Sequence, residues 1–285
     1  MAAVTRLSRP VRATTRALGD GLADVGRQLV FYAEVLYEIV TQLVLRLKYR
    51  NVVLNLISDI TIGAGAMIVG GGMIFVIFSM SFFTGTEVGL QGFKGLEQIG
   101  AEAFTGLIGS FANTREVTPL IAGVAFAAQV GAGFTAELGA MRISEEIDAL
   151  EVMSVPSKAY LVATRVVAAF IAILPLYLIS LFASFFATKL VSTMFFGLSS
   201  GVYDYYFRLY LPPIDIFYSL VKAGIFATIV ALIHCYYGYH ATGGPAGVGV
   251  AVGRAIRLSI VTVVVLNLVL SLIFWGGGDT VSLTG

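Results

Sequence analysis

Five stretches of the chain lack Lys, Arg, Asp and Glu over at least 20 residues each, and no other feature limits the fold as strongly. About 20 apolar residues cross the hydrocarbon core of a bilayer as a helix, and a helix satisfies its own backbone where lipid offers no partner. The pattern therefore predicts an all-α, polytopic membrane protein with five transmembrane helices. The stretches cover residues 60–86, 117–136, 166–188, 223–253 and 258–278.

The small share of charged residues agrees with a membrane protein. Only 12% of the 285 residues are Asp, Glu, Lys or Arg, whereas soluble domains average about 25%. A sixth uncharged run, 190–203, has 14 residues and is short for a span. We interpret it as a re-entrant or interfacial piece, or as an extension of the third span.

The positive charges indicate how the chain lies in the membrane. If the N-terminus is cytosolic, 13 of the Lys and Arg residues fall on the cytosolic side and 5 on the other side. Cytosolic loops of membrane proteins carry an excess of Lys and Arg. The distribution therefore predicts a multi-pass protein of the plasma (inner) membrane, with a cytosolic N-terminus and an extracytoplasmic C-terminus.

The first 50 residues divide into two parts. Residues 1–20 form a basic segment that we expect to be a cytosolic tail. Residues 21–50 have the spacing of an amphipathic helix that lies in the inner membrane interface, although a helix packed on soluble protein shows the same spacing. The apolar positions that define its face are Leu22, Val25, Leu29, Tyr32, Leu36, Val40, Leu43 and Leu47.

Small residues and one proline shape the expected spans. The first span is expected at about residues 55–83, and a piece at 103–112 is apolar enough to enter the membrane before the second span. Pro119 suits the first turn of a helix, with Thr118 as its cap. We therefore expect a broken helix there, with an ordinary outer loop as the alternative. Small residues at four-residue spacing let helices pack closely, within the chain or between subunits. They are Gly123, Ala127, Gly131, Gly249 and Gly253.

A short acidic segment joins two apolar runs at residues 137–153. Ser144 can cap a helix of about 11 residues there, acidic side chains suit its first turn, and Pro156 ends it. A membrane protein has little reason to crowd acids between two spans unless a partner protein contacts them. We interpret the segment as a docking helix, with a solvated connecting turn as the alternative. Its shared apolar face consists of Ile143, Ile147 and Leu150.

Nothing in the sequence predicts catalysis, a metal site, a cofactor or nucleic-acid binding in this chain. The glycine-rich stretch 243–253 lacks the Gly-Lys-Ser/Thr ending of a phosphate loop. His234 and His240 have no carboxylate at ligand spacing, and Cys235 has the setting of a small buried residue. Any ATP and Mg that this protein depends on would therefore be bound by a separate ATPase chain.

Four pieces of the chain together resemble one known family. They are Arg115-Glu-Val-Thr-Pro119, the run through Gln129-Val-Gly-Ala-Gly133, the segment 136–150, and residues 237–249. The family is the MlaE/YrbE group of lipid-transport permeases. The extended basic N-terminus and the sequence Gly243-Gly-Pro245 look most like the B-type YrbE subunit of an actinobacterial (mycobacterial) Mce lipid-import system.

This resemblance implies a function and a set of partners. Residues 51–285 would form the permease domain of an ABC transporter, and residues 142–154 would be the coupling helix that docks into a cytosolic ABC ATPase dimer. The other implied partners are a second permease of the A type, extracytoplasmic Mce proteins, and a fatty acid, sterol or phospholipid as substrate. The implied coupling residues are Arg142, Glu145, Glu146, Asp148, Ala149 and Leu150.

Arg115 and Glu116 form a charged pair at the outer end of the second expected span. Ionisable residues at membrane depth usually mark functional sites, but charged residues at a helix end also serve only as anchors. The resemblance favours the first interpretation and implies a lipid cavity lined by Arg115, Glu116 and Pro119.

Two other functions remain open at this point. A stand-alone secondary transporter or channel would need ionisable groups inside the membrane, and the five spans as delimited hold no carboxylate. A membrane enzyme acting on lipids would need a catalytic grouping, and no Ser/His/Asp set suggests one. The sequence therefore favours a permease subunit over both.

Overall fold

The structure is a computed structural model that describes residues 23–44, 48–63 and 72–276. Within these ranges it is all-α and has no strand, which confirms the predicted fold class. The expected basic tail at residues 1–20 and the C-terminal end at 279–285 lie outside the described residues.

Five helical segments of the described chain are long and apolar enough to cross a membrane, as the sequence predicts. Three of them are single helices, namely α4 (Gly72–Glu97), α11 (Pro213–Tyr239) and α12 (Gly244–Trp275). The other two are the continuous helical segments Glu102–Ile143 and Lys158–Phe195, which include π-helical turns.

The remaining elements complete these two spans or connect them. The second span consists of η2 (Glu102–Phe104), α5 (Thr105–Ala112), η3 (Asn113–Val117), α6 (Thr118–Phe126), η4 (Ala127–Gly131) and α7 (Ala132–Ile143). The third consists of η5 (Lys158–Ala163), α9 (Thr164–Leu190) and η6 (Val191–Phe195). The shorter elements are a helix at 23–38, η1 (Ile39–Val44), α2 (Arg50–Thr61), α8 (Glu146–Val152) and α10 (Ser200–Leu209).

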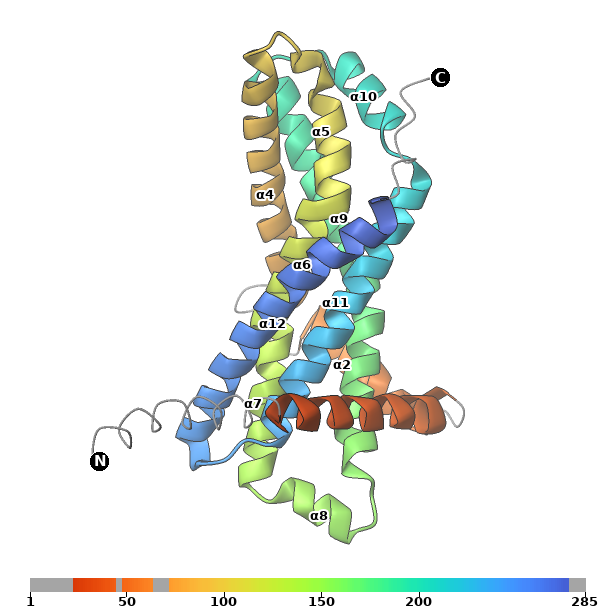
Figure 1. The fold of residues 1–285 in the computed structure, drawn as a ribbon, viewed down its shortest axis with the longest axis vertical. Helices are drawn as coiled ribbons and strands as arrows, with labels where there is room; N and C mark the ends of the chain where they lie inside the picture. The colour runs from red at the N-terminus through yellow and green to blue at the C-terminus, as the bar shows by residue number, and fades with distance from the viewer. Residues whose placement is uncertain (1–22, 45–47, 64–71, 277–285) are drawn as a thin grey trace, which may run out of the picture.

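The helices form an elongated bundle (Figure 1). The short helix α8 lies at one end and α10 lies at the other, and we refer to these as the α8 end and the α10 end. α12 crosses the bundle diagonally, and the helix at 23–38 runs across the long axis close to the α8 end (Figure 1).

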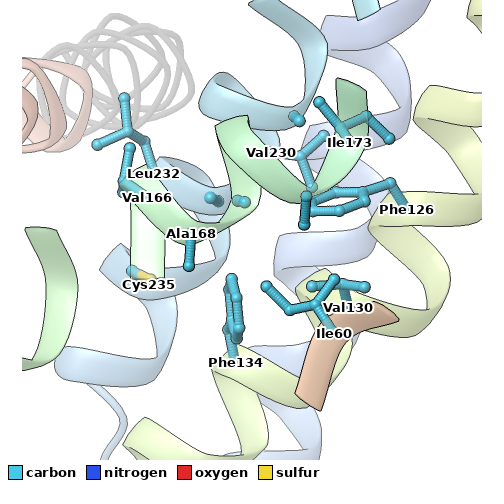
Figure 2. Close-up of a cluster of buried hydrophobic side chains, with 14 of the residues drawn as sticks. Ile60, Phe126, Val130, Phe134, Val166, Ala168, Ile173, Val230, Leu232 and Cys235 are labelled. Atoms are coloured by element: carbon cyan, nitrogen blue, oxygen red, sulfur yellow. The ribbon is translucent and has the colours of Figure 1, made fainter. Parts of the chain in front are cut away.

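The core of the bundle is built by the second, third and fourth spans. Most of their facing side chains are apolar and withdrawn from solvent, so that van der Waals packing holds these helices together. Buried polar side chains such as Thr164, Ser180 and His234 lie among them. Cys235 lies inside this core with no exposed surface. Figure 2 labels Ile60 from α2, Phe126, Val130 and Phe134 from the second span, Val166, Ala168 and Ile173 from α9, and Val230, Leu232 and Cys235 from α11.

The second span does not break before Pro119, so this prediction was wrong. The helix runs without interruption from Glu102 to Ile143, and Thr118 lies inside it and caps nothing. A proline inside an α-helix lacks an N–H and crowds the carbonyl four residues earlier. The chain absorbs this defect in a π-turn, where the Thr118 N–H reaches back to the carbonyl of Asn113.

Two other span boundaries differ from those expected. The first span as described is α4, Gly72–Glu97, and residue 55 lies outside it, because residues 50–61 form the separate amphipathic helix α2, which buries Val53 and Ile60. The third span continues to Phe195. The uncharged run at 190–203 is therefore in part an extension of the third span, which was one of the expected alternatives.

The connection between the fourth and fifth spans lies earlier in the chain than expected. The apolar run at 223–253 contains a turn at Gly243 and Gly244, whose φ angles are 87° and 70°. This left-handed region is open to glycine without steric cost. Arg254 and Arg257 consequently lie inside α12 and not in the connection between two spans.

The helix at 23–38 is attached to the bundle by one face only. Phe31 and Val35 are 3% and 0% exposed, and the Phe31 ring lies 5.4 Å from the ring of Tyr236 and 5.6 Å from that of Tyr239. An amphipathic helix that presents apolar side chains away from the protein is suited to a membrane interface. That location stays a prediction. The predicted apolar positions that remain exposed include Val25, Leu29, Leu36 and Val40.

α4 and α9 approach most closely at a glycine. A Cβ atom added to Gly85 would lie 2.4 Å from the carbonyl oxygen of Ser184. One turn away, the buried hydroxyls of Ser81 and Ser180 share a hydrogen bond of 2.5 Å. The small side chains therefore allow both a close backbone approach and a polar contact between the two helices.

We expect Gly85→Ala to destabilise the bundle, because overpacking a close contact typically costs about 1–3 kcal/mol. Circular dichroism measures the melting temperature of the purified chain in detergent. The melting temperature should fall by several degrees. Gly95→Ala is the control, since a Cβ at Gly95 of the same helix meets nothing within 4 Å. Equal melting temperatures for the two variants would contradict the close approach.

Candidate functional site

A buried ion pair lies within the spans, in the half of the bundle nearer the α10 end. Nε and Nη2 of Arg115, from η3, approach Oδ2 of Asp215 at 2.9 and 2.8 Å. The two side chains are only 5% and 2% exposed. Trp275, at the end of α12, donates Nε1–H to Oδ1 of Asp215 at 2.9 Å. Both carboxylate oxygens are thus hydrogen-bonded, as a buried charge requires.

Lys222 of α11 donates a hydrogen bond to the backbone carbonyl that Pro119 deprives of its α-helical partner. Because Pro119 has no N–H, the carbonyl of Arg115 loses the partner that an α-helix would supply. The fully buried Lys222 Nζ donates to that carbonyl at 2.7 Å and to Oγ of Ser271 at 2.6 Å. It also lies 3.7 Å from Oε2 of Glu116. One ammonium group therefore connects η3, α11 and α12.

Glu116 is the most accessible member of this set, which we call the outer ion cluster (Arg115, Glu116, Asp215 and Lys222). Its side chain is 45% exposed, and Oε2 accepts a hydrogen bond of 2.6 Å from Nδ2 of Asn267 on α12. Arg115 and Lys222 are committed to partners inside the protein, so Glu116 is the group best placed to meet a polar ligand.

Sequence reasoning identified only part of the outer ion cluster. Arg115 and Glu116 were predicted, whereas Asp215 and Lys222 were assigned to connections between spans. The expected absence of carboxylates from the spans was wrong, since Glu116 and Asp215 lie inside them. One signal was available, because residues seven apart share a helix face, and Asp215 and Lys222 have that spacing. Pro119, predicted to line a cavity, is buried within α6.

The acidic segment forms α8 at the end of the bundle, but the helix is shorter than expected. It has 7 residues, Glu146–Val152, and the residue before it is Glu145 in the left-handed conformation with φ 59°. Ser144 does not cap it, because its hydroxyl donates to the carbonyl of Ala140 at 3.0 Å and to Oε1 of Glu146 at 2.8 Å. The predicted cap and length of about 11 residues were therefore wrong.

α8 combines an acidic exterior with one apolar anchor. Ile147 is fully buried and Leu150 packs against the core. Arg142 and Asp148 form an ion pair at 2.6 Å between side chains that are 37% and 56% exposed, which contributes little to stability. The predicted coupling residues that are exposed are Glu145, Glu146, Asp148 and Ala149.

Hydrogen bonds tie the far end of α8 to the fourth span. Oε1 of Glu151 accepts hydrogen bonds from the Ser157 hydroxyl at 2.7 Å and from the Tyr239 hydroxyl at 3.1 Å. The two hydroxyls lie 2.8 Å apart. Lys158, the next residue, pairs with Glu34 of the helix at 23–38 at 2.5 Å. A displacement of α8 therefore acts on α11 and on the N-terminal helix.

The predicted packing residues differ in what surrounds them. A Cβ at Gly123 would lie 3.0 Å from Val263, and one at Gly131 would lie 2.5 Å from the His234 ring. Ala127, between them, is fully buried. A Cβ at Gly249 or Gly253 would meet nothing within 4 Å, so these two pack against no other helix of the described chain.

His234 is a buried connector of three helices. Its Nδ1 lies 2.8 Å from Oγ1 of Thr135 on α7, and its Nε2 lies 3.2 Å from Oγ of Ser259 on α12. Both ring nitrogens thus have polar partners. Among the residues that the structure describes, no group of three or more His, Cys, Asp and Glu is placed to hold a metal ion.

Comparisons with known proteins identify the class of this bundle. Residues 62–273 match the family described as Permease MlaE, and the chain belongs to this family of multi-pass membrane permeases. A probable ABC transporter permease protein of Rickettsia bellii is 35% identical over 200 residues, which cover 70% of this chain and 77% of that protein. A probable ABC transporter permease protein of Synechocystis is 32% identical over 199 residues, with coverages of 70% and 76%.

A plant protein is also similar. The chloroplastic protein TRIGALACTOSYLDIACYLGLYCEROL 1 of Arabidopsis thaliana is 31% identical over 201 residues, which cover 70% of this chain and 57% of that protein. Together these findings make the chain a permease subunit.

We expect Asp215→Ala to destabilise the protein strongly, because removing one partner of a buried ion pair costs about 3–5 kcal/mol. The measurement is the melting temperature of the purified chain in detergent. Asp204→Ala is the matched control, since Asp204 pairs with Lys189 at 2.8 Å where the side chains are 37% and 40% exposed. Such a pair contributes about 0–1 kcal/mol. A loss no greater than that of the control would contradict the importance of the buried pair.

Proposed function

We propose that this chain is the permease subunit of an ATP-driven lipid transporter. The observation that carries the proposal is α8, whose exposed carboxylates stand on a helix with a fully buried Ile147 and hydrogen bonds to α11. A solvated connecting turn needs no such anchor. An acidic surface held firmly at the end of two spans suits a partner that pushes on the permease.

The partner at α8 is a cytosolic ABC ATPase dimer. The Rickettsia and Synechocystis relatives are named as probable ABC transporter permeases, and the match to the permease family covers residues 62–273. ATP and Mg then belong to the ATPase chain. The contacts come from Arg142, Glu145, Glu146, Asp148, Ala149 and Leu150.

The transported molecule is a lipid, either a fatty acid, a sterol or a phospholipid. Support comes from the outer ion cluster, where the half-exposed Glu116 stands beside the buried Lys222 within the spans. A polar headgroup is the part of a lipid that such a site recognises. The name of the Arabidopsis relative refers to a glycolipid. Arg115 and Pro119 hold Glu116 in place from within the helix.

The chain pairs with a second permease through α12. Small residues mark helix interfaces in membranes, and Gly249 and Gly253 of α12 have open space beside them. The lipid cavity then lies between the two permeases. The resemblance to the B-type YrbE subunit of an actinobacterial Mce system suggests an A-type paralogue as the partner and extracytoplasmic Mce proteins as the lipid donors.

The proposed cycle converts ATP binding into movement of the spans. The ATPase dimer closes on ATP, the coupling helices follow, and lipid passes between the cavity and the Mce proteins. An ATPase biases the permease only through contacts that differ between its states. The cycle places α8 and the N-terminus in the cytosol and the C-terminus outside the plasma membrane, in agreement with the charge distribution.

The proposal is tested first by purification of the chain from its native membrane in mild detergent. We expect an ATPase, a second permease and Mce-type proteins in the same complex, with ATPase activity. A chain that purifies alone, without ATPase activity, would contradict the proposal.

Charge reversal then tests α8 itself. In the variant Glu145→Lys with Glu146→Lys, ATP hydrolysis should continue while lipid transport falls about 5- to 150-fold, the range of typical coupling free energies. The measurement is ATPase activity and lipid transport in proteoliposomes. The control is Glu97→Lys, an exposed acid at the end of α4 far from α8. Full coupling in the double variant would refute the role of α8.

The outer ion cluster is tested by lipid uptake in cells that depend on lipid import. We expect both Arg115→Ala and Glu116→Gln to reduce uptake, because the first removes the ion pair with Asp215 and the second removes the accessible charge. Uptake is normalised to the amount of assembled complex. Glu116→Gln leaves the Arg115–Asp215 pair intact but removes the negative charge beside Lys222. The melting temperature of this variant is therefore measured as well, so that a loss of ligand contact is separated from a loss of stability. Unchanged uptake with normal assembly would remove that residue from the site.

A further inference from the structure

A polar cleft lies near the α8 end, away from the outer ion cluster. It has a volume of about 600 Å³ and is lined by residues of the helix at 23–38, the end of α11, the turn that follows it and the start of α12. Its polar lining includes Arg27, Gln28, His240, Thr242 and Arg254. Nothing in the proposed transport cycle uses this cleft.

The cleft is electropositive. Arg254 is exposed, and no carboxylate of the described residues forms an ion pair with it. Among the residues that the structure describes, Arg27 pairs with Asp24, three residues earlier and also in the lining. Exposed pairs of this kind are weak, so Arg27 is free to turn towards a stronger anionic partner.

His240 of the lining is kept neutral mainly by burial, and nearby positive charges act in the same direction. Partial burial, and then the charges of Lys158, Arg142 and Arg27, lower the pKa of His240 below its ordinary value, and only its bond to the Tyr236 carbonyl opposes this. The imidazole is therefore neutral at pH 7, and because Nδ1–H is donated to the Tyr236 carbonyl at 2.9 Å, Nε2 can only accept a hydrogen bond.

The other wall of the cleft is apolar, and α12 continues from it past the exposed Arg257 to an apolar face. Tyr236, Tyr237, Val250 and Ala251 belong to the lining, and Val250 is 53% exposed. Above it α12 presents a continuous exposed apolar face. A ligand with an anionic group and a hydrocarbon chain matches both walls, because the group meets the arginines while the chain covers this face. The exposed residues of the face are Val261, Val264, Val265, Leu268 and Leu272.

We propose that this cleft binds the phosphate group of an anionic membrane lipid, held by Arg27 and Arg254, with a hydrocarbon chain along α12. The phosphate site is separate from the outer ion cluster, and the hydrocarbon chain lies further along α12 than Gly249 and Gly253, the residues proposed to face the second permease. The membrane leaflet in which this lipid lies is the one part that rests on the proposed function, which makes it the cytosolic leaflet. A lipid held there would bridge the N-terminal helix and the start of the fifth span.

The test compares two lipids on the full chain, purified in neutral detergent with the subunits that accompany it. Native mass spectrometry measures the binding of phosphatidylglycerol and of phosphatidylcholine. Because hydrogen bonds to charged groups are among the strongest in proteins, we expect the wild type to prefer phosphatidylglycerol about tenfold or more. The double variant Arg27→Gln with Arg254→Gln should lose this preference.

Arg257→Gln is the matched control, since Arg257 is exposed one turn further along α12 and does not line the cleft. It should keep the preference. Equal binding of both lipids by the wild type, or an equal loss in the control, would overturn the proposal. Displacement by glycerol 3-phosphate at the concentration of the lipid itself would overturn the lipid assignment in favour of a soluble phosphate. Lipid binding is measured without ATP, so its result does not depend on whether the chain takes part in ATP-driven transport.

Discussion

A backbone carbonyl that loses its helical partner inside a membrane has to be satisfied by the protein itself, and this requirement organises the α10 half of the bundle. Pro119 creates the need at Arg115, and Lys222 meets it at 2.7 Å. A buried ammonium in turn needs nearby negative charge and further acceptors. Glu116 at 3.7 Å and Ser271 at 2.6 Å supply them, so one proline accounts for polar contacts on three helices.

The same polar contacts explain how α12 is held. Lipid tails are as apolar as a helix surface, so apolar burial alone gives helices in a membrane little reason to associate. α12 instead relies on hydrogen bonds near its end, through Asn267 and Trp275, and on small residues elsewhere. Gly123 approaches Val263, and a Cβ at Gly139 would lie 2.9 Å from Val248. The rest of its surface stays exposed for lipid or for a second subunit.

Apolar run length was enough to predict the all-α fold and the number of spans, because the bilayer imposes a length that the sequence must match. The predicted span boundaries were wrong where a charged residue is buried inside a span and where a turn contains no charged residue. Asp215 and Lys222 fall between the expected third and fourth spans. Their partners in η3 lie 100 and 107 residues away, so no local pattern reveals them. The turn at Gly243 lies inside an uncharged run, where no charge marks it and only the glycines and Pro245 indicate it. For the same reason, the sequence predicted only Arg115 and Glu116 of the four residues in the outer ion cluster.

The second span connects the two candidate sites mechanically. Its continuous helix carries Glu116 in η3 and ends at Ile143, directly before α8. Between them lies η4, and π-turns are positions where a helix changes its hydrogen-bond register. Gly131 of η4 lies against His234, whose ring joins α7, α11 and α12. Under the proposed function, a displacement of α8 therefore moves α7, α11 and α12 together. The movement reaches the outer ion cluster through the π-turn η4, where the second span can deform.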